Sequence, residues 1–205
     1  NEMTQKPKTV GPGSLFVIAG PSGAGKTTLT RLALAQNPRL ALSISTATRA
    51  PRPGEENGVH YHFVSVETFR QMQAAGDFLE SAEVHGNFYG TSRQGIETLL
   101  AADRDVILEI DWQGAQQVRK VYPESVGVFI LPPSFDVLET RLQGRGQDSA
   151  EVIARRVANA REELQHLNEF PYVIINENLD EALAELLAVF AAARVRLVNQ
   201  SQRCA

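Results

Sequence analysis

One short segment, GPSGAGKT at residues 20–27, limits the folds open to this chain more than any other. Its spacing is that of the phosphate-binding loop, G-x-x-x-x-G-K-[ST]. Gly20, Gly23 and Gly25 allow the backbone to curl, so that successive N–H groups face phosphate oxygens and the next helix adds the positive end of its dipole. An apolar run, SLFVIAG, comes before the loop and a helical pattern, KTTLTRLALAQN, comes after it. A chance glycine-rich turn with a solvated lysine explains that context poorly, so the segment predicts a nucleoside triphosphate site.

Two side chains of this loop are expected to act on the triphosphate. Lys26 would reach the β- and γ-phosphates, and Thr27 would offer its hydroxyl to Mg²⁺, which screens charge between phosphate oxygens. The residues predicted to bind ATP here are Gly20, Pro21, Ser22, Gly23, Ala24, Gly25, Lys26, Thr27 and Thr28. The loop alone does not decide the reaction, because GTPases, motors and small-molecule kinases share it.

The order of strand, turn and helix returns along the rest of the chain. DVILEID, VGVFIL and YVIIN are compact apolar runs suited to buried strands. The first two precede plausible helices, and YVIIN precedes the long helical pattern LDEALAELLAVFAAARVRLV. Strands that alternate with helices predict an α/β fold, with a mostly parallel sheet of the P-loop NTPase type covered by helices on both faces.

Two polar segments interrupt that alternation. Between about residues 45 and 91 the chain changes to short, aromatic-rich pieces such as HYHFVSV and GNFYGT, which predict an inserted subdomain. GRGQDSAE leads into EVIARRVANAREELQHL, a charged helix without a wide apolar stripe, and predicts a mobile lid at about residues 141–158. The core would then comprise residues 13–44 and 92–205, after a flexible lead-in at residues 1–12.

Composition limits the setting and the partners. The 205 residues are 43% hydrophobic, enough for a full core, and the formal net charge of −4 argues against a general nucleic-acid surface. No apolar run approaches the ~20 residues of a membrane span. The lone Cys204 provides no disulfide framework, which suits a reducing compartment. We therefore expect a cytoplasmic protein with no nucleic-acid and no membrane partner.

An arginine pair marks the inserted subdomain. Arg49 and Arg52 lie three residues apart in TATRAPRPGEENG, on a segment stiffened by two prolines. Guanidinium groups match phosphate oxygens bidentately, so the pair suits one dianionic phosphate. Taken alone, a solvated surface pair explains the arginines equally well. Tyr61 and Tyr89 are candidates to lend hydroxyls to the same anion, although tyrosines in such stretches often only pack.

Six segments occur together in a fixed order: GPSGAGKTTL, STATRAPRPGEENGVHYHFVS, FLESAEVHGNFYGTS, LEIDWQGAQQVRK, FILPPS and RLQGRGQDS. In this combination the chain resembles the guanylate kinases, and the bacterial members in particular, from about Gly13 to the C-terminal helix. The resemblance implies transfer of the γ-phosphoryl group from ATP to GMP, giving ADP and GDP, and so a supply of GDP for guanine nucleotide metabolism. ATP and GMP are the implied partners, with Mg²⁺ accompanying ATP.

The resemblance also implies an acceptor site for GMP. Arg49, Arg52, Tyr61 and Tyr89 match residues on the GMP phosphate, and Ser45, Glu80, Thr91 and Asp111 match residues around the guanine. Chemistry supports the two acids, because guanine presents N1–H and an exocyclic amine as adjacent donors, whereas adenine presents a bare N1. Asp111 ends an apolar run, where α/β sheets place ligand-facing side chains. Glu80 follows two apolar residues, and a solvated glutamate remains an alternative.

The remaining residues implied by the resemblance lie later in the chain. Arg141, Arg145 and Arg156 match lid arginines that would act with Lys26 in catalysis by offsetting charge on the transferred group. Arg155 is an alternative to Arg156, and without the resemblance a solvated helix would be the simpler interpretation. Asn176 matches a residue near the adenine. Glu109 stands where many family members have Asp, so its role stays open.

Three functional hypotheses follow from the sequence. The first is an active guanylate kinase, the second a kinase for another monophosphate, and the third a kinase-like module that binds a phosphorylated protein in the acceptor cleft. The phosphate-loop residues Lys26 and Thr27 and the lid arginines are all present, which favours an enzyme. The basic C-terminal segment, RVRLVNQSQR, leaves homo-oligomerisation open.

Overall fold

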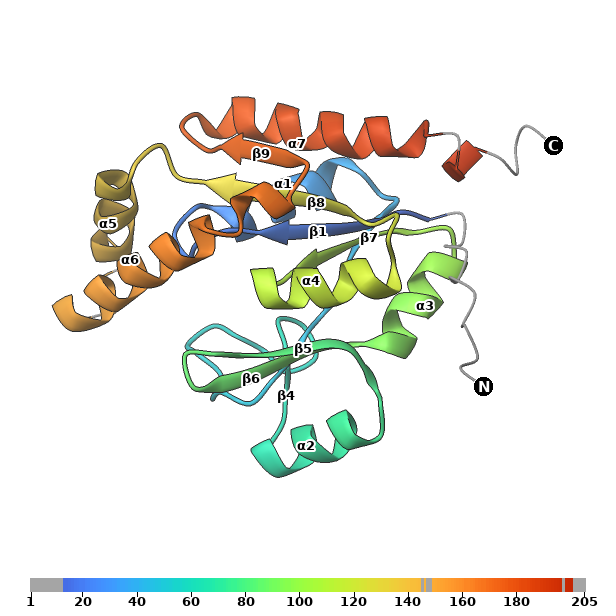
Figure 1. Ribbon diagram of the computed structural model, residues 1–205, viewed down its shortest axis with the longest axis horizontal. Helices are drawn as coiled ribbons and strands as arrows, with labels where there is room; N and C mark the ends of the chain where they lie inside the picture. The colour runs from blue at the N-terminus through green and yellow to red at the C-terminus, as the bar shows by residue number, and fades with distance from the viewer. Residues whose placement is uncertain (1–12, 145, 147–148, 197, 201–205) are drawn as a thin grey trace.

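The computed structural model describes residues 13–144, 146, 149–196 and 198–200 (Figure 1). The segment expected as a lead-in, residues 1–12, lies outside the described residues, as does Arg145.

A five-stranded parallel sheet forms the centre of the molecule, with strand order β2-β7-β1-β8-β9. Its strands are β1 (Leu15–Ala19), β2 (Leu40–Leu42), β7 (Asp105–Glu109), β8 (Val126–Leu131) and β9 (Tyr172–Ile175). Every residue of β1 is buried, because a central parallel strand is covered on both faces, and this is why the strand reads as an uninterrupted apolar run. The predicted α/β class is confirmed.

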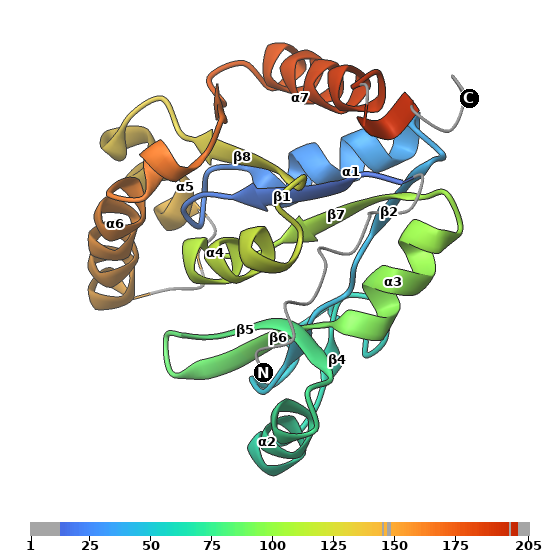
Figure 2. The same ribbon diagram turned by 45° about the vertical axis from the view of Figure 1, so that its right-hand side comes forward.

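Helices cover both faces of this sheet (Figures 1 and 2). On one side lie α1 (Lys26–Gln36) and α7 (Leu179–Arg194), and on the other α3 (Arg93–Ala101) and α4 (Trp112–Val121). Successive residues of β1 serve opposite faces: Phe16 packs in the cluster containing Phe190 of α7, with ring centroids 4.5 Å apart, whereas Val17 packs in the cluster containing Val118 of α4. Helix α7 ends at Arg194, so Val195 and Arg196, which the helical pattern had included, lie beyond it.

A second sheet lies beside the first, on the side of α4 (Figure 2). Its strand order is β4-β3-β6-β5, and its elements are β3 (Thr46–Ala47), β4 (His62–Phe63), α2 (Val66–Ala74), β5 (Phe78–Val84) and β6 (Asn87–Ser92). Phe69 of α2 stacks on Phe78 and Phe88 and gives this sheet an apolar centre of its own. A two-residue turn, His85-Gly86, joins β5 to β6 with φ angles of 52° and 80°. Both angles are positive, as a tight type I′ hairpin requires.

Two further helices, α5 (Phe135–Gly144) and α6 (Ala150–Leu164), pack together at one end of the main sheet, followed by the short helix η1 (Leu167–Glu169). The sequence suggested that α6 has no wide apolar stripe. The helix instead presents a narrow one, in which Ile153, Val157 and Ala160 recur at spacings of four and three and pack with Leu138 and Leu142 of α5. This pairing fixes which side of α6 faces α5.

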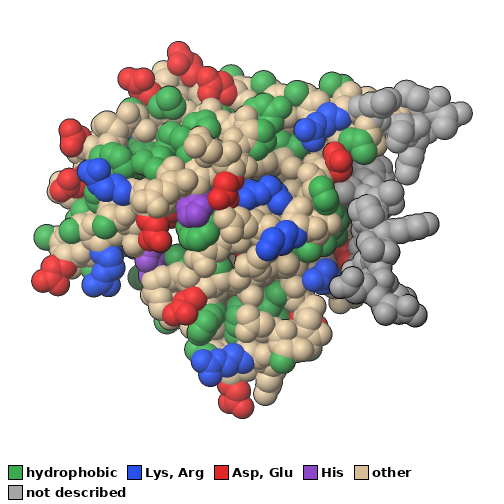
Figure 3. All heavy atoms as spheres, in the orientation of Figure 1, with side chains coloured by type: hydrophobic (Ala, Val, Ile, Leu, Met, Phe, Trp, Pro, Cys, Tyr) green, Lys and Arg blue, Asp and Glu red, His purple; other side chains and the backbone are tan. Residues whose placement is uncertain are grey.

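Charged side chains are dispersed over the face of the molecule seen in Figure 3. Figure 3 shows basic and acidic groups interspersed on the face seen in Figure 1, where grey atoms cover part of the right side. Within the described part of the chain, no helix is both long and apolar enough to cross a bilayer.

Candidate active site

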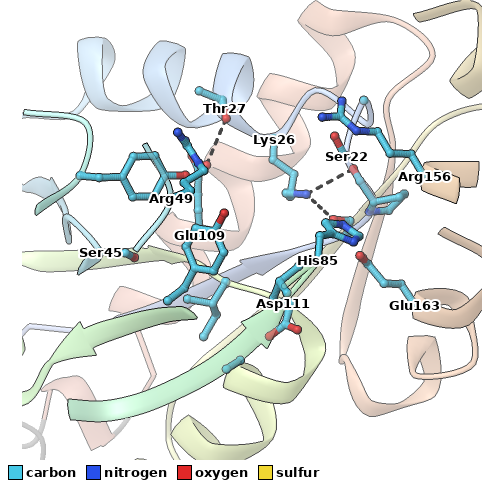
Figure 4. A pocket seen from close by; sticks show the side chains of 18 of the residues that line it. Ser22, Lys26, Thr27, Ser45, Arg49, His85, Glu109, Asp111, Arg156 and Glu163 are labelled. Atoms are coloured by element: carbon cyan, nitrogen blue, oxygen red, sulfur yellow. Dashed lines mark hydrogen bonds between the residues drawn. The ribbon is translucent and has the colours of Figure 1, made fainter. Parts of the chain in front are cut away.

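A cleft opens where the main sheet, the second sheet and helix α6 meet (Figure 4). It holds about 330 Å³, which lies in the usual size range of small-molecule sites. The parts of the chain that line it are the loop after β1, the segment around β3, the β5–β6 hairpin, the end of β7 and the inner side of α6. Residues that are far apart in the sequence therefore line one cleft.

The loop after β1 curls as its glycines allow. Gly20, Gly23 and Gly25 have φ angles of 134°, 89° and 92°. A Cβ atom would lie 2.2 Å from the Ile130 carbonyl oxygen at Gly20, and 2.3 Å from Asn176 Nδ2 at Gly25. Side chains are therefore excluded at both positions by backbone conformation and by neighbouring atoms. The loop leads directly into the N-terminus of α1, which is the geometry of an anion site.

Lys26 lies inside this curl. Its ammonium group donates to the carbonyl oxygens of Gly20 and Pro21 (Figure 4). These contacts hold the positive charge within the loop.

Thr27 points toward the end of β7. Its Oγ1 donates to Glu109 Oε2 at 3.2 Å (Figure 4). Strand β7 pairs with β1, and Glu109 lies opposite Ile18, so the parallel pairing brings the last side chain of β7 beside the phosphate loop. A hydroxyl and a carboxylate oxygen are hard donors of the kind that Mg²⁺ prefers when substrate phosphates and water complete its shell. The residues present therefore fit that ion, and Glu109 belongs to the same constellation as Thr27.

The arginine and tyrosine residues of the second sheet gather on one wall. Ser45, Arg49, Arg52, Tyr61 and Tyr89 all line the cleft. The Arg49 guanidinium lies 4.8 Å from the Tyr61 ring centroid, and the Tyr61 and Tyr89 rings meet at 6.2 Å. Burial is the main cause that raises the pKa of Tyr61, which keeps its hydroxyl protonated as a donor. The tyrosines therefore pack and present hydroxyl groups to the cleft at the same time.

Glu55 is a partner of Arg49 that the sequence did not single out. Arg49 Nη1 donates to Glu55 Oε1 at 2.6 Å and Arg49 Nη2 donates to Glu55 Oε2 at 2.8 Å. The pKa of Glu55 falls to about 2, chiefly because of the hydrogen bond from Arg49. The same pairing raises the pKa of Arg49. The pair is therefore fully ionised.

Glu80 is buried, with 3% of its surface exposed, so it is not a solvated glutamate. Its Oε1 accepts a hydrogen bond of 2.6 Å from the Thr91 hydroxyl. Burial is the main cause that raises the pKa of Glu80 to about 7; the hydrogen bond from Thr91 acts in the opposite direction, and the charge of Asp111 contributes to the rise. Gly114 explains how a carboxylate fits here, because a Cβ at that position would lie 2.4 Å from Glu80 Oε2.

Asp111 caps helix α4 beside Glu80. Its Oδ1 accepts from the Gly114 N–H at 3.0 Å, and its Oδ2 accepts from Gln113 Nε2 at 2.9 Å. The cap fixes the carboxylate at the mouth of the cleft, which Asp111 lines together with Glu80. Two acids from different elements are thus held next to each other.

Four predicted site residues lie behind the cleft rather than on its wall. Thr91 is buried behind Glu80, and Ala24 is buried within the loop. Asn176 is also buried, and its Nδ2 donates to the Ala24 carbonyl oxygen at 2.9 Å. Arg141 Nη2 in turn donates to the Asn176 carbonyl oxygen at 2.9 Å. In this structure Asn176 and Arg141 thus support the phosphate loop from beneath.

The lid arginines are separated by the helical phase of α6. Arg156 is half-buried and lines the cleft, whereas Arg155 is exposed. Arg156 lies three residues after Ile153 and four before Ala160, so it is next to the stripe of α6 that packs against α5. Of the two alternatives, the structure directs Arg156 into the cleft.

The sequence is similar to known guanylate kinases over nearly its whole length. The family profile described as guanylate kinase matches residues 13–193. Guanylate kinase of Dechloromonas aromatica is 59% identical over 191 residues, covering 93% of this chain and 95% of that protein. Guanylate kinase of Xanthomonas oryzae pv. oryzae is 56% identical over 191 residues, covering 93% and 94%. The chain belongs to the guanylate kinase family.

A solved guanylate kinase has the same fold. The crystal structure of guanylate kinase from Anaplasma phagocytophilum superposes with a TM-score of 0.78 at 32% identity, covering 94% of this chain and 90% of that one. Family membership therefore extends over nearly the whole chain and includes the catalytic fold, and the protein is an enzyme of this family.

Two cleft residues of this guanylate kinase family member were missed in the sequence. His85, at the tip of the β5–β6 hairpin, lies with its Nδ1 3.1 Å from Asn159 Nδ2 of α6, so the second sheet and the lid helix touch there. Burial and the charges of Arg156 and Arg155 lower the pKa of His85. Glu163 lines the cleft, and burial raises its pKa, with Lys26 acting in the opposite direction (Figure 4). Helical spacing could have predicted the position of Glu163, because it lies three residues after the buried Ala160 and therefore on the same side of α6.

Proposed function

We propose that this enzyme transfers the γ-phosphoryl group of ATP to GMP, giving ADP and GDP, with ATP on the phosphate loop and GMP against the second sheet. The observation that carries the proposal is the meeting, in one cleft, of the phosphate loop with the buried Glu80 carboxylate and the Arg49 guanidinium. Both substrates then face each other across a space that three parts of the chain can close. We place this reaction in the cytoplasm.

In the donor site, backbone N–H groups of the loop and the Lys26 ammonium would hold the triphosphate. Arg156 lines the same cleft and would offset charge that develops on the transferred group, with Arg145 a second candidate. We assign Arg141 and Asn176 a supporting role. Asn176 donates to the Ala24 carbonyl oxygen of the loop, and Arg141 donates to the carbonyl oxygen of Asn176. Thr27 and Glu109 would hold Mg²⁺, which supplies charge screening between phosphate oxygens.

In the acceptor site, Arg49, Arg52 and the Tyr61 and Tyr89 hydroxyls would bind the GMP phosphate. Glu80 and Asp111 would accept the N1–H and amine protons of guanine, with Ser45 at the edge and Thr91 orienting Glu80 through its hydroxyl. The attacking group is a phosphate oxygen that is already anionic. The protein therefore needs no general base, and positioning with charge neutralisation carries most of the catalysis.

Two variants test the division into donor and acceptor sites. Lys26→Ala should remove most turnover and leave GMP binding largely intact, because the lysine belongs to the donor loop. Arg52→Ala should weaken GMP binding by ~1.5–3 kcal/mol, as expected for a hydrogen bond to a charged group, with little change for ATP. Calorimetric titration of each nucleotide into each variant measures both effects. A reversed pattern, in which Arg52→Ala loses ATP and retains GMP, would show that the sites are exchanged.

A further inference from the structure

Glu55 makes three hydrogen bonds that connect the two arginines of the second sheet. Two come from Arg49 Nη1 and Nη2, at 2.6 and 2.8 Å, and the third comes from the backbone N–H of Arg52, at 2.8 Å. The backbone closes the same turn, because Glu55 N donates to the Arg52 carbonyl oxygen at 2.9 Å. One carboxylate therefore ties the side chain of one arginine to the main chain of the other.

The pairing uses one edge of the Arg49 guanidinium. Nη1 also donates to the Ala50 carbonyl oxygen at 3.1 Å, so its two protons go to Glu55 and Ala50, and one Nη2 proton goes to Glu55. These three contacts do not involve the Nε proton or the second Nη2 proton. A guanidinium carries five N–H donors in a rigid plane, and its Nε–Nη2 edge can take a second acceptor bidentately. The Arg49 Cζ lies over the Tyr61 ring, 4.8 Å from its centroid, and the Tyr61 hydroxyl also accepts a hydrogen bond from the Arg49 side chain.

We propose that Glu55 is a positioning residue for the acceptor phosphate: it holds one edge of Arg49 so that the other edge is presented to the phosphate of GMP. The inference rests on the proposed function, which places that phosphate at Arg49 and Arg52. Glu55 acts through Arg49 and does not itself contact the nucleotide.

An opposite effect of Glu55 has to be weighed. A carboxylate close to a phosphate repels it, and a carboxylate on the guanidinium can compete with it. Competition would require the two anions to share an edge, whereas the observed contacts leave the Nε–Nη2 edge out of the pairing. A free arginine side chain also has much rotamer entropy to lose on binding, and an arginine already held in place loses less. Both considerations predict that Glu55 strengthens GMP binding.

Glu55→Gln is the principal variant, and Glu56→Gln is its matched control. Both remove one negative charge from the same loop, but Glu56 is exposed and its neighbour Glu55 makes the arginine contacts. We expect the KM for GMP and the Kd for GMP to rise about tenfold in Glu55→Gln, with the KM for ATP unchanged. In Glu56→Gln both constants should stay near the parental value. An unchanged KM for ATP also shows that the variant is folded.

A double-mutant cycle with Arg49→Ala tests whether the effect passes through Arg49. Arg49→Ala alone should weaken GMP binding, and adding Glu55→Gln should then cost little more, because there is no guanidinium left to position. A tighter Kd for GMP in Glu55→Gln would identify a competitor and overturn the proposal, as would equal effects of Glu55→Gln and Glu56→Gln or full additivity in the cycle. If Arg49→Ala leaves GMP binding unchanged, the acceptor site itself is misplaced and the role of Glu55 falls with it.

Discussion

We expect the Glu80→Gln variant to gain stability relative to the parent protein as the pH rises from acidic to alkaline. The carboxyl group is buried and its pKa is raised from 4.5 to about 7. A folded-state pKa above the unfolded value means that the folded protein binds the proton more tightly. The stability that Glu80 contributes is therefore complete below about pH 4.5 and is lost as the pH rises toward 7 and above.

The magnitude follows from the two pKa values. With 4.5 in the unfolded chain and about 7 in the folded protein, proton linkage removes about 2–3 kcal/mol from the free energy of unfolding between pH 5 and pH 8. Glutamine has nearly the same size, and its carbonyl oxygen can still accept the hydrogen bond from Thr91. The substitution therefore removes the titration while it retains the packing beside Gly114.

Urea unfolding at pH 5 and at pH 8 measures the effect in the parent and in Glu80→Gln. Every other titrating group is common to the two proteins, so the difference between their pH dependences isolates Glu80. We expect Glu80→Gln to gain about 2–3 kcal/mol over the parent on going from pH 5 to pH 8. Parallel pH profiles for the two proteins would refute the reasoning, since they would mean that folding does not bury an ionisable Glu80.

Three further predictions concern the loop, the ion and closure. Asn176→Ala should destabilise the fold by ~1–3 kcal/mol in thermal or urea unfolding and raise the KM for ATP more than that for GMP, because it leaves the buried Ala24 carbonyl oxygen without its donor. Glu109→Gln should raise the Mg²⁺ concentration needed for half-maximal activity, and an unchanged requirement would exclude Glu109 from the ion site. GMP together with a non-hydrolysable ATP analogue should compact the molecule beyond either ligand alone, because closure keeps water from the transferred group; unchanged small-angle scattering in all four states would contradict it.

The sequence predicted the central sheet because burial on both faces leaves a readable pattern. Strands β1, β7 and β8 are largely buried apolar runs of five or six residues. The edge strand β9 is an apolar run of four residues in which only Ile174 is buried, so the prediction of a buried strand at YVIIN was wrong in that respect. Strands β2, β3 and β4 have only two or three residues each and carry no periodicity. Those short strands depend on their neighbours in the sheet. Local sequence therefore could not place them.

The site residues also divide into those that the sequence could predict and those that it could not. The glycines and Lys26 of the phosphate loop are specified by local backbone geometry, so their spacing was sufficient. Glu55 and His85 are polar residues in polar segments, and their importance arises only from contacts with Arg49 and Asn159 that folding creates. Glu80 was predicted as a guanine-site residue from the family resemblance, because its burial beside Gly114 does not show in the hydrophobic pattern of the surrounding sequence.

Base selection is the most direct test of the account, because it requires both the acceptor site and the reading of guanine by Glu80. The measurement is kcat/KM for GMP, IMP and AMP in the parent and in Glu80→Gln, with ATP saturating. IMP keeps the N1–H of guanine but lacks its amine, and AMP presents an acceptor to the buried Glu80 carboxylate. We expect the order GMP, IMP, AMP in the parent and a smaller preference for GMP over IMP in Glu80→Gln. Ratios that are the same in both proteins would show that Glu80 does not read the base.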